Sequence, residues 1–417
     1  MKCKIIHLMD HPPAYSEFSN QEKPPVHWVL PNGEWVGIWG EEWGDLMGAE
    51  IMKADPEIEF EVWQPDLRAD KVYSHTFDGG LKHLHFPAQE KYFWYGLKRH
   101  NYISSNQLIN LIKSNLSEIT ILHLPFPHFP LVKSVINHFK NEKIVVTCLG
   151  DLHLPLNRLG KFSLNVLSKF YLFREHFILK KILAHVNSFT LINHKFLKDF
   201  SKVYPGPYSI VPMGIDTEYW TKKDKAACRK ALNLPKDRII LFSSSRLIQL
   251  KQVDKLISIL NRISLTHDFV YVVSGHGTRE YEQYLRTLAQ PLIEKKQILF
   301  TGYVSNEELL DYYNAADLFI LTSLTEGSPV GVQKAFACGV PVISTNVGYT
   351  AELMQEHNVG IVLEKSDYEQ WEKQLSLSFS GKFPLPFDRT MAEKEFSWPN
   401  VANKFIQVFK NCQGEQP

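Results

Sequence analysis

The fold is decided by Ile239-Ile240-Leu241-Phe242-Ser243 and by the short apolar runs that follow it, each separated from the next by a segment of helical period. The later runs are Val270–Val273, Ile298–Phe300, Leu318–Leu321, Val342–Ser344 and Gly360–Leu363, and the helices between them begin at Val253, near Arg279, at Asn306 and near Val332. This alternation predicts βαβ units and a parallel sheet. Right-handed crossovers bring the carboxyl ends of such strands to one edge, where ligands bind. Ser305 and Glu308 form a capping box that marks the start of the helix at Asn306.

The composition is that of a globular protein with two domains. The chain has 417 residues, of which 44% are hydrophobic and 22% charged, and its formal net charge is +1. This balance gives no global field that would attract nucleic acid. Every apolar run falls short of the roughly 20 residues that a membrane span needs, and the N-terminal segment predicts a buried strand rather than a signal peptide. The five cysteines are widely spaced without a C-x-x-C pair, which favours free thiols and a cytoplasmic location.

The first half of the chain predicts a second α/β domain with a less regular pattern. Expected strands are Cys3–Met9, Glu59–Trp63, Ile119–His123, Lys143–Leu149 and Ser188–Ile192, and expected helices lie near Asn106–Lys113, Leu131–Phe139 and Leu164–Leu183. Residues 11–45 and 64–95 are rich in Pro, Trp, Phe and His without a clear period, which leaves open an acceptor pocket or loops packed with aromatic side chains. Pro and Gly cluster near 204–216, so the expected domains are 1–205 and 206–397.

Three segments of the second half follow predicted strands and so lie at the ligand edge. The first carries Arg246 and Lys251, which offer two positive charges to a ligand or are simply solvated. The second is Gly275-His276-Gly277, which is either a ligand-contacting turn or a tight turn that needs glycine. The third is the loop Thr301–Val304, whose backbone groups suit a flat base.

A fourth segment, Glu326–Val342, follows a strand with small residues and leads into a helix. Unpaired N–H groups at such a helix start bind phosphate, and the helix dipole favours the anion. Glu326, directly before this turn, is placed to accept hydrogen bonds from sugar hydroxyls. The chain contains no P-loop and no dinucleotide-binding fingerprint.

The run from Arg246 to Glu352 resembles the donor domain of the family-4 retaining glycosyltransferases, which have the GT-B architecture. The matching motifs are R-x4-K at Arg246 and Lys251, G-x-G at Gly275–Gly277, G-x-V at Thr301–Val304, the first acid of E-x7-E at Glu326, and the G-G-x-x-E end at Gly348–Glu352. Weaker matches are Val211–Asp216 with the interdomain segment, Trp39–Gly48 with the glycine-rich loop of the first domain, and Ser397-Trp398 with the C-terminal element. The resemblance implies two Rossmann-like domains facing a central cleft, with the helix from about 398 to 417 joining the first domain.

The resemblance also implies roles for the matching residues. Arg246 and Lys251, helped by the backbone N–H groups of Val330 and Gly331, would stabilise the charge on the departing diphosphate. Glu326 would orient the sugar. The implied donor-binding residues are Gly275, Tyr303, Val304, Ser328, Pro329, Val330, Gly331 and Lys334. The acceptor-side candidates are His123, His128, His153, Gly40 and Gly44, and a structural histidine is the alternative for His123 and His128.

Two positions depart from the family pattern. Lys334 stands where the family has its second Glu, and a lysine, which has only donors, cannot accept hydrogen bonds from ribose. Loss of one charge-assisted hydrogen bond weakens donor binding by roughly tenfold to a hundredfold. Three alternatives are open for Lys334. It pairs with Glu326, it binds a donor phosphate, or it marks an inactive copy of the enzyme. In the first domain Leu149 takes the place of the usual His, and Asp151 is the favoured catalytic substitute.

The expected function is transfer of a hexose-type sugar, with retention, from a UDP-, GDP- or ADP-sugar. The expected acceptor is a glycan, a lipid-linked precursor or a small hydroxyl compound, in cell-surface polysaccharide or glycolipid synthesis. No cofactor or metal is expected, since the donor half has no D-x-D motif. The alternatives are another enzyme on the same architecture and a degenerate copy that binds a glycan or serves as a scaffold. The basic stretch 158–181 indicates either a peripheral contact with the inner face of a membrane or a solvated helix.

Overall fold

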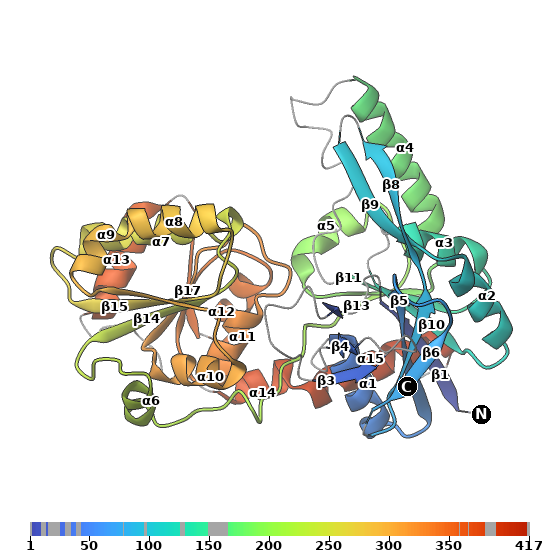
Figure 1. Ribbon diagram of the computed structural model, residues 1–417, viewed down its shortest axis with the longest axis horizontal. Coiled ribbons are helices and arrows are strands. Elements are labelled where there is room, and N and C mark those ends of the chain that lie inside the picture. The colour runs from blue at the N-terminus through green and yellow to red at the C-terminus, as the bar shows by residue number, and fades with distance from the viewer. Residues whose placement is uncertain are drawn as a thin grey trace. The chain divides into compact units, whose positions relative to one another are not determined.

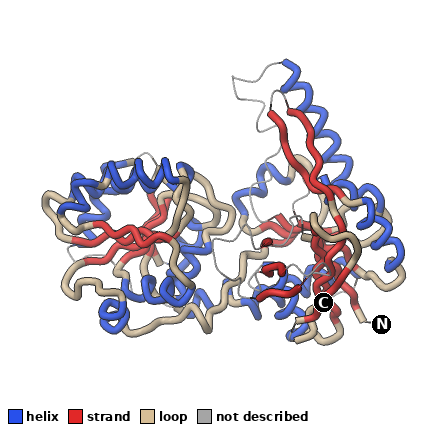
Figure 2. Tube along the Cα trace, viewed as in Figure 1, coloured by secondary structure: helices blue, strands red, loops and turns tan. Residues whose placement is uncertain are grey.

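The computed structural model describes most of the chain as two compact units (Figures 1 and 2). The first unit is Met1–Gly214 with Trp398–Pro417, and the second is Ile215–Ser397. The described residues are 2–9, 14–15, 26–29, 35–38, 43–77, 79–95, 98–125, 130–148, 166–357, 359–365, 367–379 and 389–414. Residues 206–214 stay with the first unit because the short strand within them adds to its sheet.

The second unit is built on a parallel sheet in the order β16-β15-β14-β17-β18-β19. Its strands are β14 (Ile239–Ser244), β15 (Phe269–Ser274), β16 (Ile298–Gly302), β17 (Leu318–Leu321), β18 (Val342–Thr345) and β19 (Gly360–Leu363). Each apolar run predicted from the sequence is one of these strands, so the prediction of a parallel sheet is confirmed. The chain adds β15 and β16 on one side of β14 and then returns to place β17 on the other. The strand order therefore reverses between β14 and β17.

Helices cover both faces of this sheet (Figure 1). One face carries α7 (Val253–Ile263), α8 (Arg279–Leu288), α9 (Gln290–Glu294) and α13 (Tyr368–Phe379). The other carries α6 (Lys225–Ala231), α10 (Asn306–Ala315), α11 (Val330–Ala337), α12 (Thr350–His357) and α14 (Thr390–Phe396). Along β14, Ile240 and Phe242 pack on the second face and Leu241 on the first, as the two-residue period of a strand requires.

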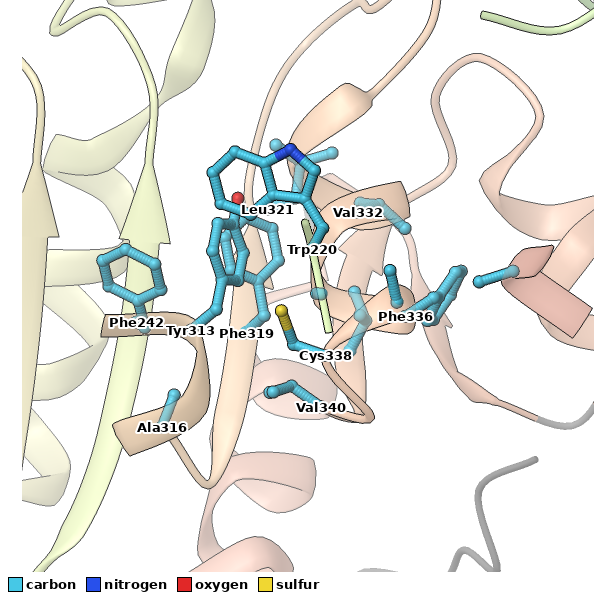
Figure 3. Close-up of a cluster of buried hydrophobic side chains, with 14 of the residues drawn as sticks. Trp220, Phe242, Tyr313, Ala316, Phe319, Leu321, Val332, Phe336, Cys338 and Val340 are labelled. Carbon is cyan, nitrogen blue, oxygen red and sulfur yellow. The ribbon is translucent and has the colours of Figure 1, made fainter. Parts of the chain in front are cut away.

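The core on the α10–α11 face supports the start of α11 (Figure 3). Phe242 and Phe319, from neighbouring strands, pack around Tyr313, and the Phe242 and Tyr313 ring centroids lie 5.0 Å apart. Trp220 packs at the edge of this cluster, with its ring centroid 5.8 Å from that of Tyr313. Gly331, in the first turn of α11, leaves little room for a side chain, because a Cβ there would lie 3.0 Å from the Phe319 ring. The first turn of α11 therefore sits directly on the core.

The first unit has a larger sheet, ordered β13-β12-β11-β10-β1-β5-β7-β6, and only β6 runs antiparallel within it. Its strands are β1 (Cys3–Leu8), β5 (Ile58–Asp66), β6 (Tyr73–Thr76), β7 (Lys82–Pro87), β10 (Ile121–Pro125), β11 (Ile144–Cys148), β12 (Ser188–Leu191) and β13 (Tyr208–Ile210). β7 lies in a stretch whose sequence showed no clear period. His83 and His85 are fully buried there, so the strand is a core strand despite its polar residues.

Helices also cover both faces of the first sheet. One face packs against α2 (Asn106–Asn115), α3 (Pro130–His138), α4 (Val166–Leu183) and α5 (Leu197–Phe200), and the other against α1 (Trp43–Ala54) and α15 (Trp398–Gln413). The remaining strands form a small antiparallel sheet of β2 (Ala14–Tyr15), β4 (Trp35–Ile38) and β3 (Val26–Val29), and a hairpin of β8 (Gln89–Tyr95) and β9 (Lys98–Ser104). No helix among the described residues has the length and apolar character to cross a bilayer.

The capping box at α10 gives a direct test of the fold. The Ser305 hydroxyl accepts a hydrogen bond from the Glu308 N–H at 3.2 Å, and the Glu308 carboxylate accepts one from the Ser305 N–H at 3.3 Å. We expect Ser305→Ala to lower the free energy of unfolding by about 1 kcal/mol, because an N–H at the helix start loses its partner. Urea denaturation measures this. The control is Ser258→Ala inside α7, whose hydroxyl only bonds the Asp254 carbonyl; equal losses in both variants would contradict the cap.

Candidate active site

An ion pair lies at the point where the strand order of the second unit reverses. Lys251 follows β14, Glu326 follows β17, and the Lys251 Nζ is 2.5 Å from the Glu326 Oε1. Their side chains are only 18% and 13% exposed. Ligands of open α/β sheets bind beyond the carboxyl ends of the strands at such a reversal. The two residues that the sequence placed at the ligand edge are therefore in contact there.

Backbone contacts hold the two loops together beneath this pair. The Thr322 hydroxyl donates to the Lys251 carbonyl at 2.8 Å, and the Leu324 N–H donates to the Leu250 carbonyl at 2.8 Å. Lys251 ends a short 3-10 helix, and the next residue, Gln252, has a left-handed φ of 50°. A non-glycine residue in that region costs about 1–3 kcal/mol and persists only where its surroundings fix it. The position of Lys251 is thus determined by the fold.

Ser323 orients the Glu326 carboxylate. Its side chain is fully buried, and its hydroxyl donates to the Glu326 Oε1 at 2.5 Å. Its carbonyl accepts a hydrogen bond from the Thr345 hydroxyl at 2.7 Å. Lys251 and Ser323 therefore converge on one carboxylate oxygen, and the other, Oε2, has no hydrogen-bond partner among the described residues. Sequence reasoning missed Ser323, whose only signal is its place between the end of β17 and Glu326.

The Arg246 loop runs directly against the Gly275–Gly277 turn. The Ser245 N–H donates to the Ser274 carbonyl at 3.1 Å, and the Leu247 N–H donates to the His276 carbonyl at 2.8 Å. A Cβ on Gly275 would lie 1.9 Å from the Ser245 carbonyl oxygen, and one on Gly277 equally close to that of Leu247. These glycines thus allow two backbones to touch. Arg246 remains exposed, with no ion pair in the described part of the chain.

The first turn of α11 offers one free amide. Pro329 is the N-cap, the Val330 N–H donates to the Ser328 carbonyl at 2.9 Å, and the Val332 N–H donates to the Pro329 carbonyl at 2.8 Å. The Gly331 N–H has no acceptor among the residues that the structure describes. Of the two amides expected to face a phosphate, only that of Gly331 is unoccupied, since the Val330 amide is already bonded within the turn.

Tyr303 and Val304 follow β16 at the same edge. Tyr303 is 61% exposed, and its ring centroid lies 6.2 Å from that of His276. Val304 is half-buried against the core on the α10–α11 face. Gly302 accepts a hydrogen bond from the Gly275 N–H at 2.8 Å, so this loop and the glycine turn are tied together. The donor-binding roles of Gly275, Tyr303 and Val304 stay predictions.

Lys334 does not pair with Glu326. Its Nζ lies 3.8 Å from the centre of the Trp220 ring, and Trp220 itself is only 5% exposed. A cation over a tryptophan face is stabilised by about 0.5–2 kcal/mol. The pairing of Lys334 with Glu326, one of the alternatives from the sequence, is therefore wrong: Lys251 occupies that place.

His123 is a core residue of the first unit. Its side chain is fully buried, with Nδ1 3.1 Å from the His7 Nδ1 and Nε2 2.6 Å from the Thr147 hydroxyl. Burial, and then the neighbouring His7, hold the pKa of His123 well below its usual range, so the ring is neutral. Gly44 in α1 packs on His7, because a Cβ there would lie 2.8 Å from the His7 ring. This placement favours the structural interpretation of His123.

Four of the predicted acceptor-side and catalytic residues lie outside the described residues. They are Gly40, His128, Asp151 and His153. Their roles stay predictions.

The site residues of the second unit fall within a segment of known family. Residues 224–394 match the glycosyl transferases group 1 family. This segment is similar to the group 1 glycosyltransferases. It contains the Arg246 loop, the Lys251–Glu326 pair and all of α11. The resemblance found in the motifs is thereby confirmed for the second unit.

Curated relatives match part of the chain. A GDP-mannose-dependent monoacylated alpha-(1-6)-phosphatidylinositol monomannoside mannosyltransferase of Corynebacterium glutamicum is 29% identical over 250 residues, which are 56% of this chain and 64% of that protein. An O-antigen biosynthesis glycosyltransferase of Escherichia coli is 25% identical over 207 residues, 49% of this chain and 55% of that protein. The matches thus span about half to two thirds of the length of these relatives.

The fold of the whole chain is similar to that of solved glycosyltransferases. The Anabaena protein HepE, solved in complex with UDP, aligns with a TM-score of 0.63 at 13% identity, over 98% of this chain and 100% of that chain. Together with the two Rossmann-like units, this likeness shows the GT-B fold that the sequence predicted.

The glycine turn gives a first test of the candidate site in the second unit. We expect Gly275→Ala to lower the melting temperature and to weaken nucleotide binding, because its Cβ would overlap the Ser245 carbonyl and displace the Arg246 loop. Gly80→Ala in the first unit is the control: Gly80 also has a positive φ, 87°, but a Cβ at that position would have no other atom within 4 Å. Thermal unfolding and calorimetry compare the two variants. Equal effects would show that backbone conformation alone, not the close approach, matters at Gly275.

Lys334 gives a second test. We expect Lys334→Met to lower the free energy of unfolding by about 0.5–2 kcal/mol through loss of the cation–π contact with Trp220. Lys334→Glu should cost more, since a carboxylate would then face the negative surface of the ring. Urea denaturation of both variants measures the difference. A Lys334→Glu variant as stable as the wild type would show that Trp220 is not the partner that holds this side chain.

Proposed function

We propose that the protein transfers a sugar from a nucleoside diphosphate sugar to a hydroxyl acceptor, with retention at the anomeric carbon. The observation that carries this proposal is the Glu326 carboxylate, anchored through Oε1 by Lys251 and Ser323 within a segment similar to the group 1 glycosyltransferases. Its second oxygen is left to accept hydrogen bonds from the hydroxyls of a sugar. Glu326 would thereby hold the donor sugar in one orientation.

The cations of the site would stabilise the leaving group. Negative charge develops on the diphosphate as the glycosidic bond breaks, and fixed donors in a partly buried site lower the barrier most effectively. Arg246 is exposed and unpaired within the described residues, Lys251 lies at the switch point, and the Gly331 N–H points from the start of α11. In the proposed same-face substitution, the departing phosphate oxygen takes the acceptor proton, and no metal is required.

The base, sugar and acceptor are proposed only as classes. UDP, GDP and ADP are the candidate carriers; the mannosyltransferase relative is named for GDP-mannose, and the HepE structure contains UDP. The same relative acts on a glycolipid by its name, and the Escherichia coli relative is named for O-antigen synthesis. We therefore propose a cell-surface glycan or a lipid-linked precursor as the acceptor, reached by a peripheral membrane contact.

Calorimetry with nucleotides and nucleotide sugars tests the proposal. The wild type should bind one of UDP, GDP and ADP, and its sugar-bearing form more tightly. Glu326→Gln should weaken the binding of the nucleotide sugar by about tenfold to a hundredfold more than that of the plain nucleotide, because loss of the partner of Lys251 affects both ligands and loss of the sugar contact affects only one. Arg246→Ala should lower kcat by about 10²–10³.

The control for the charge is Lys230→Ala, an exposed cation on α6, a helix that contacts the residues before the amino ends of β14 and β17 rather than their carboxyl ends. It should bind and turn over as the wild type does. A wild type that binds none of the three nucleotides would overturn the proposal and favour the scaffold alternative. Normal turnover in Arg246→Ala would remove that residue from the mechanism.

A further inference from the structure

Helix α4 of the first unit presents an exposed aromatic and basic surface. We call it the α4 face and define it as Phe173, Arg174, Phe177, Ile178, Lys180 and Lys181. Phe173 is 50% exposed, Phe177 54% and Ile178 39%. Figure 1 shows α4 as a long helix whose N-terminal part extends beyond the large sheet of its own unit. The donor site in the second unit uses none of these residues.

The two phenylalanines form one apolar patch. Their ring centroids are 4.7 Å apart, in edge-to-face contact. No other phenylalanine whose side chain the structure describes is comparably exposed. The opposite side of α4 is an ordinary core face, since Leu179, Ile182 and Leu183 pack into the first unit. The helix is therefore well seated, and its outward aromatic pair is a surface feature rather than a packing fault.

The charge of the α4 face is positive. Arg174, Lys180 and Lys181 are all exposed. The acid within this part of the helix, Glu175, is only 18% exposed, and it is paired with Lys133 at 3.1 Å and with Arg174 at 3.4 Å. The face thus offers aromatic rings beside cations and no uncompensated carboxylate among its described residues. This combination is complementary to the surface of a bilayer, which has anionic headgroups outside and an apolar interior.

We propose that the α4 face docks on an anionic lipid bilayer. Phe173 and Phe177 would enter the headgroup region, and the lysines and Arg174 would contact lipid phosphates. The inference rests on the proposed function in one respect: docking would bring the first unit to a lipid-linked acceptor. The docking itself requires neither donor nor acceptor. A second copy of the chain and an acidic protein are the competing occupants of the same face.

Co-sedimentation of the full chain with phospholipid vesicles tests the docking. One set of vesicles contains phosphatidylcholine alone and the other contains added phosphatidylglycerol. The wild type should sediment with the anionic vesicles, and salt should weaken this binding because the cations are screened. Phe173→Ser/Phe177→Ser and Lys180→Glu/Lys181→Glu should each lose about tenfold or more in binding.

Matched controls make the same kinds of change at exposed positions elsewhere. Leu265→Ser removes an apolar side chain that is 79% exposed in the second unit. Lys236→Glu/Lys255→Glu makes the same change in net charge at two exposed lysines of the second unit. Both controls should bind vesicles as the wild type does. Equal binding by the α4 variants and the controls, or no binding by the wild type, would overturn the proposal.

Two further readouts separate this inference from its competitors. Sedimentation velocity without lipid should give the same species for the wild type and the phenylalanine variant; a dimer lost only in the variant would assign the face to self-association and overturn the docking. Nucleotide binding by the α4 variants should equal that of the wild type, which shows that they are folded. A wild type that binds vesicles but no nucleotide would refute the proposed function and leave the docking in place.

Discussion

The ion pair between Lys251 and Glu326 is the constraint on which the site depends. Two mostly buried charges are stable only if each has its partner, and removing one leaves the other at a large cost. Because the residues follow β14 and β17, the pair forms only if the chain returns across β14 after β16. The order of the strands is thus what brings a lysine and a glutamate, 75 positions apart, within 2.5 Å.

The second unit was predictable because its signals are local. Its strands are buried on both faces, so they appear in the sequence as continuous apolar runs, and its helices have clear starts such as Ser305. The first unit was harder for a physical reason. β7 places His83 and His85 in the core, where His83 meets the carboxylate of Asp45, and buried histidines conceal a strand from any pattern of hydrophobicity.

The site was predictable as a set of residues but not as a set of contacts. Arg246, Lys251 and Glu326 were identified by their places directly after predicted strands and by the motif resemblance. These signals could not decide which lysine faces Glu326, since that depends on the direction in which α11 presents Lys334. The structure directs Lys334 to Trp220, a residue in a loop with no motif signal. Sequence motifs do not reveal contacts between side chains that are distant in the sequence, such as that of Lys334 with Trp220.

The arrangement around Glu326 also bears on the choice between an enzyme and a scaffold. The Glu326 side chain is 13% exposed, and Oε2 is not a buried atom left without a partner, so a ligand can reach it. Here Ser323 and Lys251 both bind Oε1, although the second donor could equally have satisfied Oε2. Concentrating both donors on one oxygen leaves the other available at the strand-order reversal. An oxygen without a protein donor among the described residues at this place suits a site that binds hydroxyl groups, and this favours the transferase.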